Sequence, residues 1–374
     1  MSANAKPMAA RRPTPWGHIF LWALALWGAL AATQRLLTGL GPTTNLSDGR
    51  PWGWWITFDV LCGVALAAGG FTLGAIVKIF HLKRFYPLLR PTILTAFLGY
   101  VVAAGSIVFD IGLPWRIWHP LIYHNWHSPM LEVALCVMAY TTVLLLEVSD
   151  VFFEGLHWKS LKSLVEGLMI PLVILGITLS TMHQSSLGTL FVLASKRVFA
   201  LWKTGYLPLL FFLSAVAAGL TMSIIEAYLA AKAYGHQVPQ DLLADLGLYA
   251  AWALALYLVV KIATLIGSGG SAYLLAGGRA TLLYLVEVLL GTVLPMILLF
   301  LPQVRHNRRA LTWAASLTVL GVVLNRFNVS LFGFAGAPYL PSWQEWAISL
   351  GMISAAILFY DFFVRRFPVF TPGR

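Results

Sequence analysis

The stretch that decides the fold is PWGWWITFDVLCGVALAAGGFTLGAIVKIF, residues 51–80. It contains only two charged side chains, and as a helix it is long enough to cross the roughly 30 Å hydrocarbon layer of a membrane. Comparable runs place spans at 16–37, 52–80, 91–113, 129–153, 163–184, 206–231, 241–265, 280–301, 310–331 and 343–366. The sequence therefore predicts an all-α integral membrane protein with ten transmembrane helices.

The composition of the 374-residue chain supports this class, because 59% of the residues are hydrophobic and only 10% are charged. A transmembrane β-barrel would instead show short alternating segments. The two cysteines, Cys62 and Cys136, lie in apolar runs without a CxxC motif, so neither a zinc nor an iron–sulfur site is predicted. The net charge of +11 does not indicate nucleic-acid binding, because most basic residues lie in short loops between spans.

The basic residues predict the orientation of the chain, because cytoplasmic loops are enriched in Lys and Arg. Ten spans place both termini on one side, and 16 of the 25 basic residues fall on that side. They are Lys6, Arg11, Arg12, Lys78, Lys83, Arg84, Arg90, Lys159, Lys162, Lys232, Arg305, Arg308, Arg309, Arg365, Arg366 and Arg374. We therefore expect both termini in the cytoplasm. The basic N-terminal segment shows no cleavage site, so we expect the first helix to be retained.

The connections on the opposite, outer side are longer and richer in aromatic residues than the inner ones. They are PWRIWHPLIYHNWHS (114–128), SSLGTLFVLASKRVFALWKTG (185–205) and FGFAGAPYLPS (332–342). This asymmetry indicates that a partner docks on the outer face. The alternative is that the Trp and Tyr residues form an interfacial belt.

Ionisable and polar side chains inside the predicted spans require an explanation, because a charged group at membrane depth is costly. Asp59, Asp110, Glu132 and His183 lie toward the outer ends of four consecutive spans, and Gln184 extends the polar face of His183. Their shared level indicates one site, in which a histidine would carry protons or donate hydrogen bonds. The alternative for each is a structural side chain that hydrogen-bonds to a neighbouring helix.

A second set of polar residues lies in the middle or inner parts of the spans. It comprises Tyr100, Glu147, Asp150 and Glu226. These residues are candidates for a proton path, and the alternative is a core tyrosine with solvated acids at helix ends. Lys261 and Glu287, in the outer halves of neighbouring spans, are expected to form a buried ion pair with a structural role.

The histidines argue against a haem held between facing helices. They are His18, His81, His119, His124, His127, His157, His183, His236 and His306, and all are expected in loops or near helix ends. The alternative that stays open is a haem held at the outer surface by one loop histidine and one helix histidine, such as His119 with His183. We predict no haem in this chain.

Five segments in order along the chain carry a family resemblance: PWGWWITFDVLCGVALAAGG (51–70), RPTILTAFLGYVVAAGSIVFDIG (90–112), HSPMLEVALC (127–136), TMHQSSLGTL (181–190) and PSWQEWAISLG (341–351). In them the chain resembles the NrfD/polysulfide-reductase family of membrane subunits. It is similar in particular to the HybB-like branch, which anchors periplasmic nickel–iron hydrogenases. The segments PWGWWITFD and TMHQSSLGTL are the more specific matches.

The resemblance implies two four-helix bundles, formed by helices 2–5 and 6–9, with helices 1 and 10 peripheral. It divides the chain into residues 1–51 (cytoplasmic N-terminus, first helix and outer loop), 52–184 (first bundle with a quinone site), 185–205 (outer loop), 206–331 (second bundle) and 332–374 (outer loop, last helix and cytoplasmic C-terminus). It further implies a location in the bacterial inner membrane, among membrane lipid.

The implied function is electron transfer, in anaerobic respiration, from a periplasmic ferredoxin-like iron–sulfur subunit to menaquinone or ubiquinone. The hydrogenase small and large subunits would supply the electrons. The quinone site would contain Asp59, Asp110, Glu132, His183 and Gln184, with Glu132, His183 and Asp59 handling protons. The chain would hold no haem, iron–sulfur cluster or other redox metal, and the sequence leaves open whether the chain is itself catalytic.

As an extension, protons would reach the quinone from the cytoplasm through Tyr100, Glu132, Glu147, Asp150 and Glu226. The sequence shows acids at both ends of the first bundle without a continuous path. Three alternatives to the hydrogenase assignment stay open: the membrane subunit of another NrfD-type oxidoreductase, a secondary transporter or ion channel, and a passive anchor. We expect no obvious mid-span breaks in paired positions, which counts against a transporter.

Overall fold

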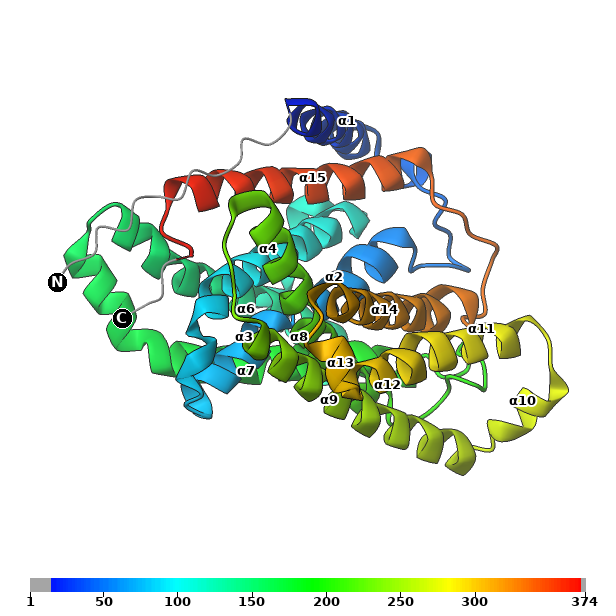
Figure 1. Ribbon diagram of the computed structural model, residues 1–374. Coiled ribbons are helices and arrows are strands. Elements are labelled where there is room, and N and C mark those ends of the chain that lie inside the picture. Colours follow the sequence, from blue (N-terminus) through cyan, green and yellow to red (C-terminus); the bar gives the residue numbers. More distant parts are fainter. Residues whose placement is uncertain (1–14, 371–374) are drawn as a thin grey trace.

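The computed structural model describes residues 15–370, and within them the chain is almost entirely helical (Figure 1). This part of the chain contains ten helices that are long and apolar enough to cross a membrane, which confirms the predicted all-α membrane architecture. The N-terminal segment with Lys6, Arg11 and Arg12, and Arg374 at the other end, lie outside the described residues. We keep the word outer for the side that the sequence predicts to face away from the cytoplasm.

Seven spans are each formed by one principal α-helix: α1 (Pro15–Thr38), α4 (Tyr86–Asp110), α6 (Pro129–Gly155), α7 (Lys159–Leu193), α8 (Leu207–Tyr234), α9 (Gln240–Gly267) and α15 (Trp343–Arg366). The second span combines η2 (Trp55–Cys62), α2 (Gly63–Leu66), α3 (Gly69–Gly74) and η3 (Ala75–Ile79). The eighth combines α11 (Arg279–Val288), η6 (Leu289–Val293) and α12 (Leu294–Phe300), and the ninth α14 (Arg308–Phe327) and η7 (Asn328–Phe332). Short helices connect them: η1 (Gly41–Thr43), η4 (Lys83–Phe85), η5 (Pro114–Arg116), α5 (His119–Ile122), α10 (Ser271–Ala276) and α13 (Pro302–Arg305).

Two of the predicted boundaries are wrong, one by five residues and the other by nine. The third span begins with α4 at Tyr86 rather than at Pro91, because Pro87 occupies the first helical turn, where its missing N–H costs nothing. The fifth span continues to Leu193 rather than ending at 184, so the first part of the expected outer loop 185–205 is helical. Gly188 allows this extension, because a Cβ there would lie 2.6 Å from the backbone nitrogen of Pro208 in α8.

The second span is interrupted near its middle, which the sequence analysis did not anticipate. A turn at Ala67–Ala68 separates α2 from α3, and η2 and η3 at the two ends are π-helical. The backbone of α8 approaches at this point, since a Cβ on Gly219 would lie 2.5 Å from the nitrogen of Gly69. π-Helical turns also occur in η6 and η7. The sequence analysis expected no mid-span breaks in paired positions, and this turn is a break in one span that it did not consider.

The helices pack in two groups that meet along the second span and α8. The second span, α4, α6 and α7 contact one another, as do α8, α9, α11–α12 and α14. The second span also contacts α8 through α2 and α3. At the edge of the molecule α1 lies alongside α15, which in turn packs on α4 (Figure 1). Gly28 and Gly351 bring the backbones of α1 and α15 together.

A buried charge network holds the second group of helices together and confirms the predicted ion pair. Glu287 on α11 accepts an ion-pair hydrogen bond from Lys261 on α9. Its two oxygens also accept bonds from Asn325 (2.8 Å), Asn328 (2.6 Å) and the indole of Trp202 (2.8 Å). Because one carboxylate takes donors from α9, α14, η7 and the outer loop, it links four segments of the fold.

We expect Glu287→Gln to destabilise the protein by about 3–5 kcal/mol, because the buried ammonium of Lys261 loses its counter-ion. The measurement is thermal unfolding of the purified chain in detergent. Glu166→Gln is the matched control, since its ion pair with Lys162 is longer (3.5 Å) and its side chain is 58% exposed. Equal unfolding temperatures for the two variants would contradict the assigned role of Glu287.

Candidate functional site

The interruption of the second span exposes a backbone carbonyl that another helix must satisfy. The N–H of Ala68 donates to the carbonyl of Ala65 (3.3 Å), one residue nearer than the α-helical partner, Val64. The side-chain amide of Gln184 donates to the carbonyl of Val64 at 2.9 Å. Inside a membrane no water is at hand for such a group. This bond therefore positions α7 against the second span, and His183 is its neighbour in the chain.

A cluster of buried polar side chains surrounds His183. The Nδ1 atom of His183 lies 3.1 Å from the hydroxyl of Tyr100, and the ring of Tyr140 meets Tyr100 edge-on at 4.6 Å between centroids. Four buried atoms here make no hydrogen bond of regular geometry with the described chain: Tyr140 Oη, Ser180 Oγ, His183 Nε2 and Gln184 Oε1. Buried polar atoms normally find a partner, so this concentration sets the cluster apart from the surrounding packing.

The position of His183 corrects the sequence analysis, which placed every histidine in a loop or near a helix end. Because α7 continues to Leu193, His183 lies well inside the helix and is fully buried. His119, named above as a pairing partner, lies on α5 against Trp118 and Tyr123 instead. The other described histidines lie outside the spans or, as His18 does, in the first turns of a helix.

Asp59 is buried on η2 and faces the last span. Its Oδ2 accepts a hydrogen bond from the hydroxyl of Ser349 on α15 at 2.5 Å, and the indole of Trp54 donates to the same hydroxyl at 3.1 Å. The carboxyl group also neighbours Ser106 of α4, and its Oδ1 is buried and makes no hydrogen bond of regular geometry within the described chain. Ser349 thus holds one carboxyl oxygen and leaves the other available.

Asp110 lies at the outer end of α4 beside a buried arginine. Arg35 of α1 donates to the carbonyls of Phe109 (2.9 Å) and Ile111 (2.8 Å), on either side of Asp110. Asp110 Oδ1 is buried and has no hydrogen-bond partner. Arg35 therefore caps the end of α4 and brings a positive charge close to Asp110.

A second group of polar contacts lies at the same end of the molecule. The hydroxyl of Tyr339 donates to Glu345 and accepts a bond from the backbone N–H of Trp54 at 2.6 Å. Burial and the adjacent carboxylate raise the pKa of Tyr339 well above its ordinary value, so the phenol keeps its proton. Ser342 and Glu345 form a capping box that starts α15.

Glu132 lies in the first turn of α6, three residues after Pro129, and is half-buried. Its carboxylate makes no hydrogen bond or ion pair with the rest of the described chain. A negative charge in this turn is favoured by the helix dipole, which is a structural reason for an acid at this position. The structure thus leaves Glu132 accessible and does not join it to His183 or Asp59.

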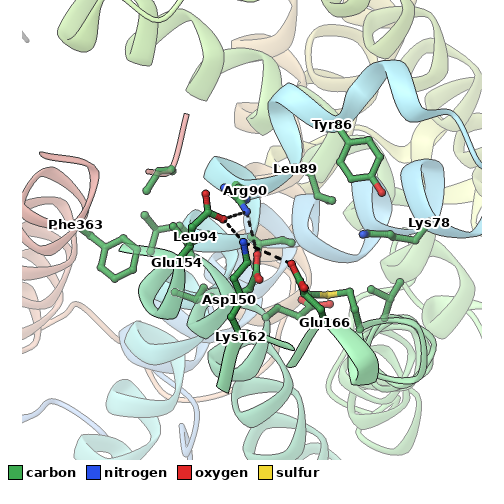
Figure 2. Close-up of a pocket in the computed structure, with 17 residues that line it drawn as sticks. Lys78, Tyr86, Leu89, Arg90, Leu94, Asp150, Glu154, Lys162, Glu166 and Phe363 are labelled. Atoms are coloured by element: carbon green, nitrogen blue, oxygen red, sulfur yellow. Dashed lines mark hydrogen bonds and ion pairs between the residues drawn. The ribbon is translucent and has the colours of Figure 1, made fainter. Parts of the chain in front are cut away.

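The inner end of the first group of helices contains a charged cavity of about 830 Å³. Figure 2 shows Arg90 between Asp150 and Glu154, with Lys162 bridging Glu154 and Glu166. The bonds from Arg90 measure 3.1 Å to Asp150 and 2.7 Å to Glu154. Glu147, buried one turn before Asp150 on α6, lines the same cavity. The cavity therefore brings both predicted inner acids of α6 to one polar space.

Glu226 has separate surroundings between α4, α8 and α15. It accepts hydrogen bonds from Thr92 (3.2 Å), Thr95 (2.5 Å) and Tyr360 (3.0 Å). These donors satisfy the buried carboxyl group locally. Glu226 thus does not line the cavity that contains Glu147.

The structure therefore joins some of the predicted residues and separates others. Tyr100, His183 and Gln184 form one cluster, Glu147 and Asp150 share one cavity, and Asp59 and Glu226 line another, while Asp110 and Glu132 have separate environments. Sequence reasoning missed Arg35, Tyr140 and Ser349, which contact or neighbour the predicted residues. Ser349 lies in a segment that carried the resemblance, Arg35 lies two residues before the end of its predicted span, and Tyr140 is ordinary in an apolar helix.

No group of three His, Cys, Asp or Glu side chains within residues 15–370 is arranged to hold a metal ion.

Comparison with known proteins connects this geometry to a family. Residues 42–335 match the model of the polysulphide reductase NrfD family. The chain is 38% identical to a protein of Nitratidesulfovibrio vulgaris, with 94% of each chain covered. It is 33% identical to the probable Ni/Fe-hydrogenase 2 b-type cytochrome subunit of Escherichia coli (92% of this chain, 89% of the relative). It is 30% identical to the integral membrane subunit of a menaquinone reductase of N. vulgaris (94% and 90%).

Proposed function

Because the chain belongs to the NrfD polysulfide reductase family, we propose that it passes electrons between an iron–sulfur partner and a membrane quinone. Family membership and ten spans make it a multi-pass membrane subunit of an oxidoreductase complex. The proposal concerns what this subunit does within such a complex. Its partner would dock on the outer, periplasmic face, with both termini of this chain in the cytoplasm of a bacterial cell.

The observation that carries the proposal is the polar cluster buried around His183. Polar atoms without partners are costly inside a membrane protein and mark functional positions. A quinone ring offers two oxygens that accept hydrogen bonds as carbonyls and donate them as hydroxyls. His183 Nε2 suits the first state as a donor, and the free oxygens of Asp59 and Gln184 suit the second as acceptors. The residues present therefore fit a quinone.

Reduction of a quinone to a quinol consumes two electrons and two protons. In our proposal His183 donates a hydrogen bond to one ring oxygen, while Asp59 or Glu132 relays a proton. Tyr100 would hold the orientation of the His183 ring through its bond to Nδ1. Asp110 and Gln184 would complete the surroundings of the ring. Because these residues lie toward the outer side, electrons would arrive from a periplasmic ferredoxin-like subunit.

We propose that the chain carries no haem, although a relative is called a b-type cytochrome subunit. Haem b in membrane cytochromes needs two facing histidines in mid-span. His183 is the described histidine deep inside a span, and its Nδ1 is engaged by Tyr100 rather than by a second histidine nearby. The donor set therefore does not fit such a haem.

The partner that we favour is a periplasmic nickel–iron hydrogenase with its small and large subunits. This choice rests on the similarity to the hydrogenase relative over nearly the whole chain. The similarity to a menaquinone reductase subunit supports a quinone, here menaquinone or ubiquinone, and keeps another NrfD-type complex as the second candidate. In either complex the redox metals would belong to the partner subunits.

As an extension, we propose that the protons come from the cytoplasm. The charged inner cavity would collect them at Asp150 and Glu147, and Tyr140 and Tyr100 would lead toward His183. This route replaces Glu226, whose bonds to Thr92, Thr95 and Tyr360 place it outside the cavity. Taking protons on the inner side would couple electron transfer to a membrane potential.

We expect His183→Gln and Glu132→Gln each to lower hydrogen-dependent quinone reduction, by about a hundredfold for a residue that transfers a proton directly. The measurement uses the intact complex in membranes. Reduction of an artificial dye by the hydrogenase subunits should persist, which shows that the complex has assembled. His306→Gln and Asp241→Asn, both exposed and outside the proposed site and proton path, are the matched controls. Normal quinone reduction in either site variant would remove that residue from the mechanism.

The absence of haem is tested by a reduced-minus-oxidised spectrum of the purified subunit. We expect no b-type absorption band, because the described chain offers no second histidine facing His183. A band at one haem per chain that disappears in His183→Gln would overturn this assignment.

Proton uptake is tested in proteoliposomes that contain the intact complex and quinone. With an inner-side route, turnover should change the pH in the compartment that faces the inner cavity, and Glu147→Gln should reduce this change. Unaltered pH in that compartment during turnover would remove the extension while leaving electron transfer intact.

A further inference from the structure

A narrow apolar groove of about 460 Å³ runs between the second span, α4, α8 and α15. It exists because α15 packs on α1 and α4 and leaves a gap beside α8. Small residues form much of its wall, including Gly63, Ala67, Gly99, Ala230 and Ala356. A Cβ added to Gly63 would meet no atom within 4 Å. The groove is therefore real space between the helices.

Hydrogen bonds close the groove at both ends. At the outer end Ser349 of α15 binds Asp59 of η2 at 2.5 Å. At the inner end Tyr360 of α15 binds Glu226 of α8 at 3.0 Å, and Tyr234 of α8 binds Asp361 at 3.0 Å. Ser349 and Tyr360 are eleven residues apart on one helix, so the space between the closures is about 16 Å long.

The side of the groove opens toward the lipid. Leu229 of α8 and Ile357 of α15 line it and are 53% and 48% exposed, respectively. In a membrane these surfaces face hydrocarbon. A linear molecule can therefore enter sideways and lie parallel to the helices.

We infer that this groove binds the isoprenoid tail of the quinone, with the head-group end beside Asp59. The inference rests on the proposed function and adds the position of the tail. A continuous apolar wall with a few polar groups at its ends is the usual form of a small-molecule site. The free Oδ1 of Asp59 at the outer end accepts a hydrogen bond from a neutral hydroxyl.

The charges at the two ends favour a quinone over a phospholipid. Both closures contain a buried carboxyl group, from Asp59 and Glu226, and the groove lining contains no Lys, Arg or His. The basic groups next to the inner closure, Arg365 and His18, are already paired with Asp361, so they are not free to bind a phosphate. A neutral ring at the outer end needs no basic partner.

The test fills the groove without touching the polar residues. Gly63→Leu and, as a second variant, Ala356→Leu place a branched side chain in the tail space. Gly167→Leu is the matched control, because it also adds a leucine to a helical glycine with no atom within 4 Å, but on the exposed side of α7. All three are measured in the intact complex with a long-tailed menaquinone and with a tailless naphthoquinone.

We expect each groove variant to lower the ratio of kcat/KM for the long-tailed quinone to that for the tailless quinone by about tenfold. Gly167→Leu should keep the wild-type ratio. The purified wild-type complex should also retain menaquinone, and the Gly63→Leu complex should lose it. Dye reduction by the partner subunits and a single peak in size-exclusion chromatography show that each complex is assembled.

The results distinguish a failure of the proposed function from a failure of the tail-site inference. If the wild-type complex reduces neither quinone, the proposed function is wrong and the inference falls with it. If it reduces both quinones but the groove variants keep the wild-type ratio, quinone reduction stands and the tail site is wrong. Recovery of a phospholipid that is retained by the wild type and lost from Gly63→Leu, with menaquinone unchanged, would also overturn the inference.

Discussion

One unsatisfied backbone carbonyl organises the first group of helices. Where the second span turns at Ala67–Ala68, the carbonyl of Val64 loses its helical partner, and Gln184 supplies the replacement. No water is available in a membrane to do this, so the side chain must come from a neighbouring helix. That requirement holds α7 against the second span and fixes the level at which His183 enters the interior. The same turn is the place where Gly219 lets α8 approach, so the junction of the two groups depends on it as well.

The buried polar side chains of the two groups of helices differ in how many of their atoms have hydrogen-bond partners. In the second group Glu287 receives donors on both oxygens from four side chains, a pattern of a structural network. In the first group Asp59 and His183 each use one side-chain atom and leave the other without a partner. Hydrogen-bond donors and acceptors without partners at membrane depth lower the stability of the protein. A ligand that forms hydrogen bonds with them raises that stability again. The contrast is one of degree, since Arg326 Nε and Asn328 Oδ1 in the second group also lack a partner in the described chain, and it supports our proposal that the first group contains the chemistry.

Sequence reasoning predicted the ten spans because a run of about twenty apolar residues is favoured as a helix that crosses the membrane. It also predicted the ion pair of Lys261 with Glu287, because a buried charge is costly unless an opposite charge on a neighbouring span pairs with it. It misjudged α7, because the local sequence around Gly188 does not decide whether the helix ends, and the continuation depends on how Gly188 packs against α8. It also missed the turn in the second span, because a stretch rich in Gly and Ala is compatible with both a regular and an interrupted helix.

The composition and spacing of residues by themselves determined the membrane class, the number of spans and the family, because these depend on local hydrophobicity and on short motifs. Which polar side chains meet was decided only by the tertiary structure. Asp59, Glu132 and His183 share a level in the sequence pattern, yet Asp59 turns to Ser349 of α15, His183 to Tyr100 of α4, and Glu132 stays at a helix start. The side of a helix on which a side chain lies depends on π-helical turns, and its neighbours depend on the packing of distant spans. The local sequence determines neither of these.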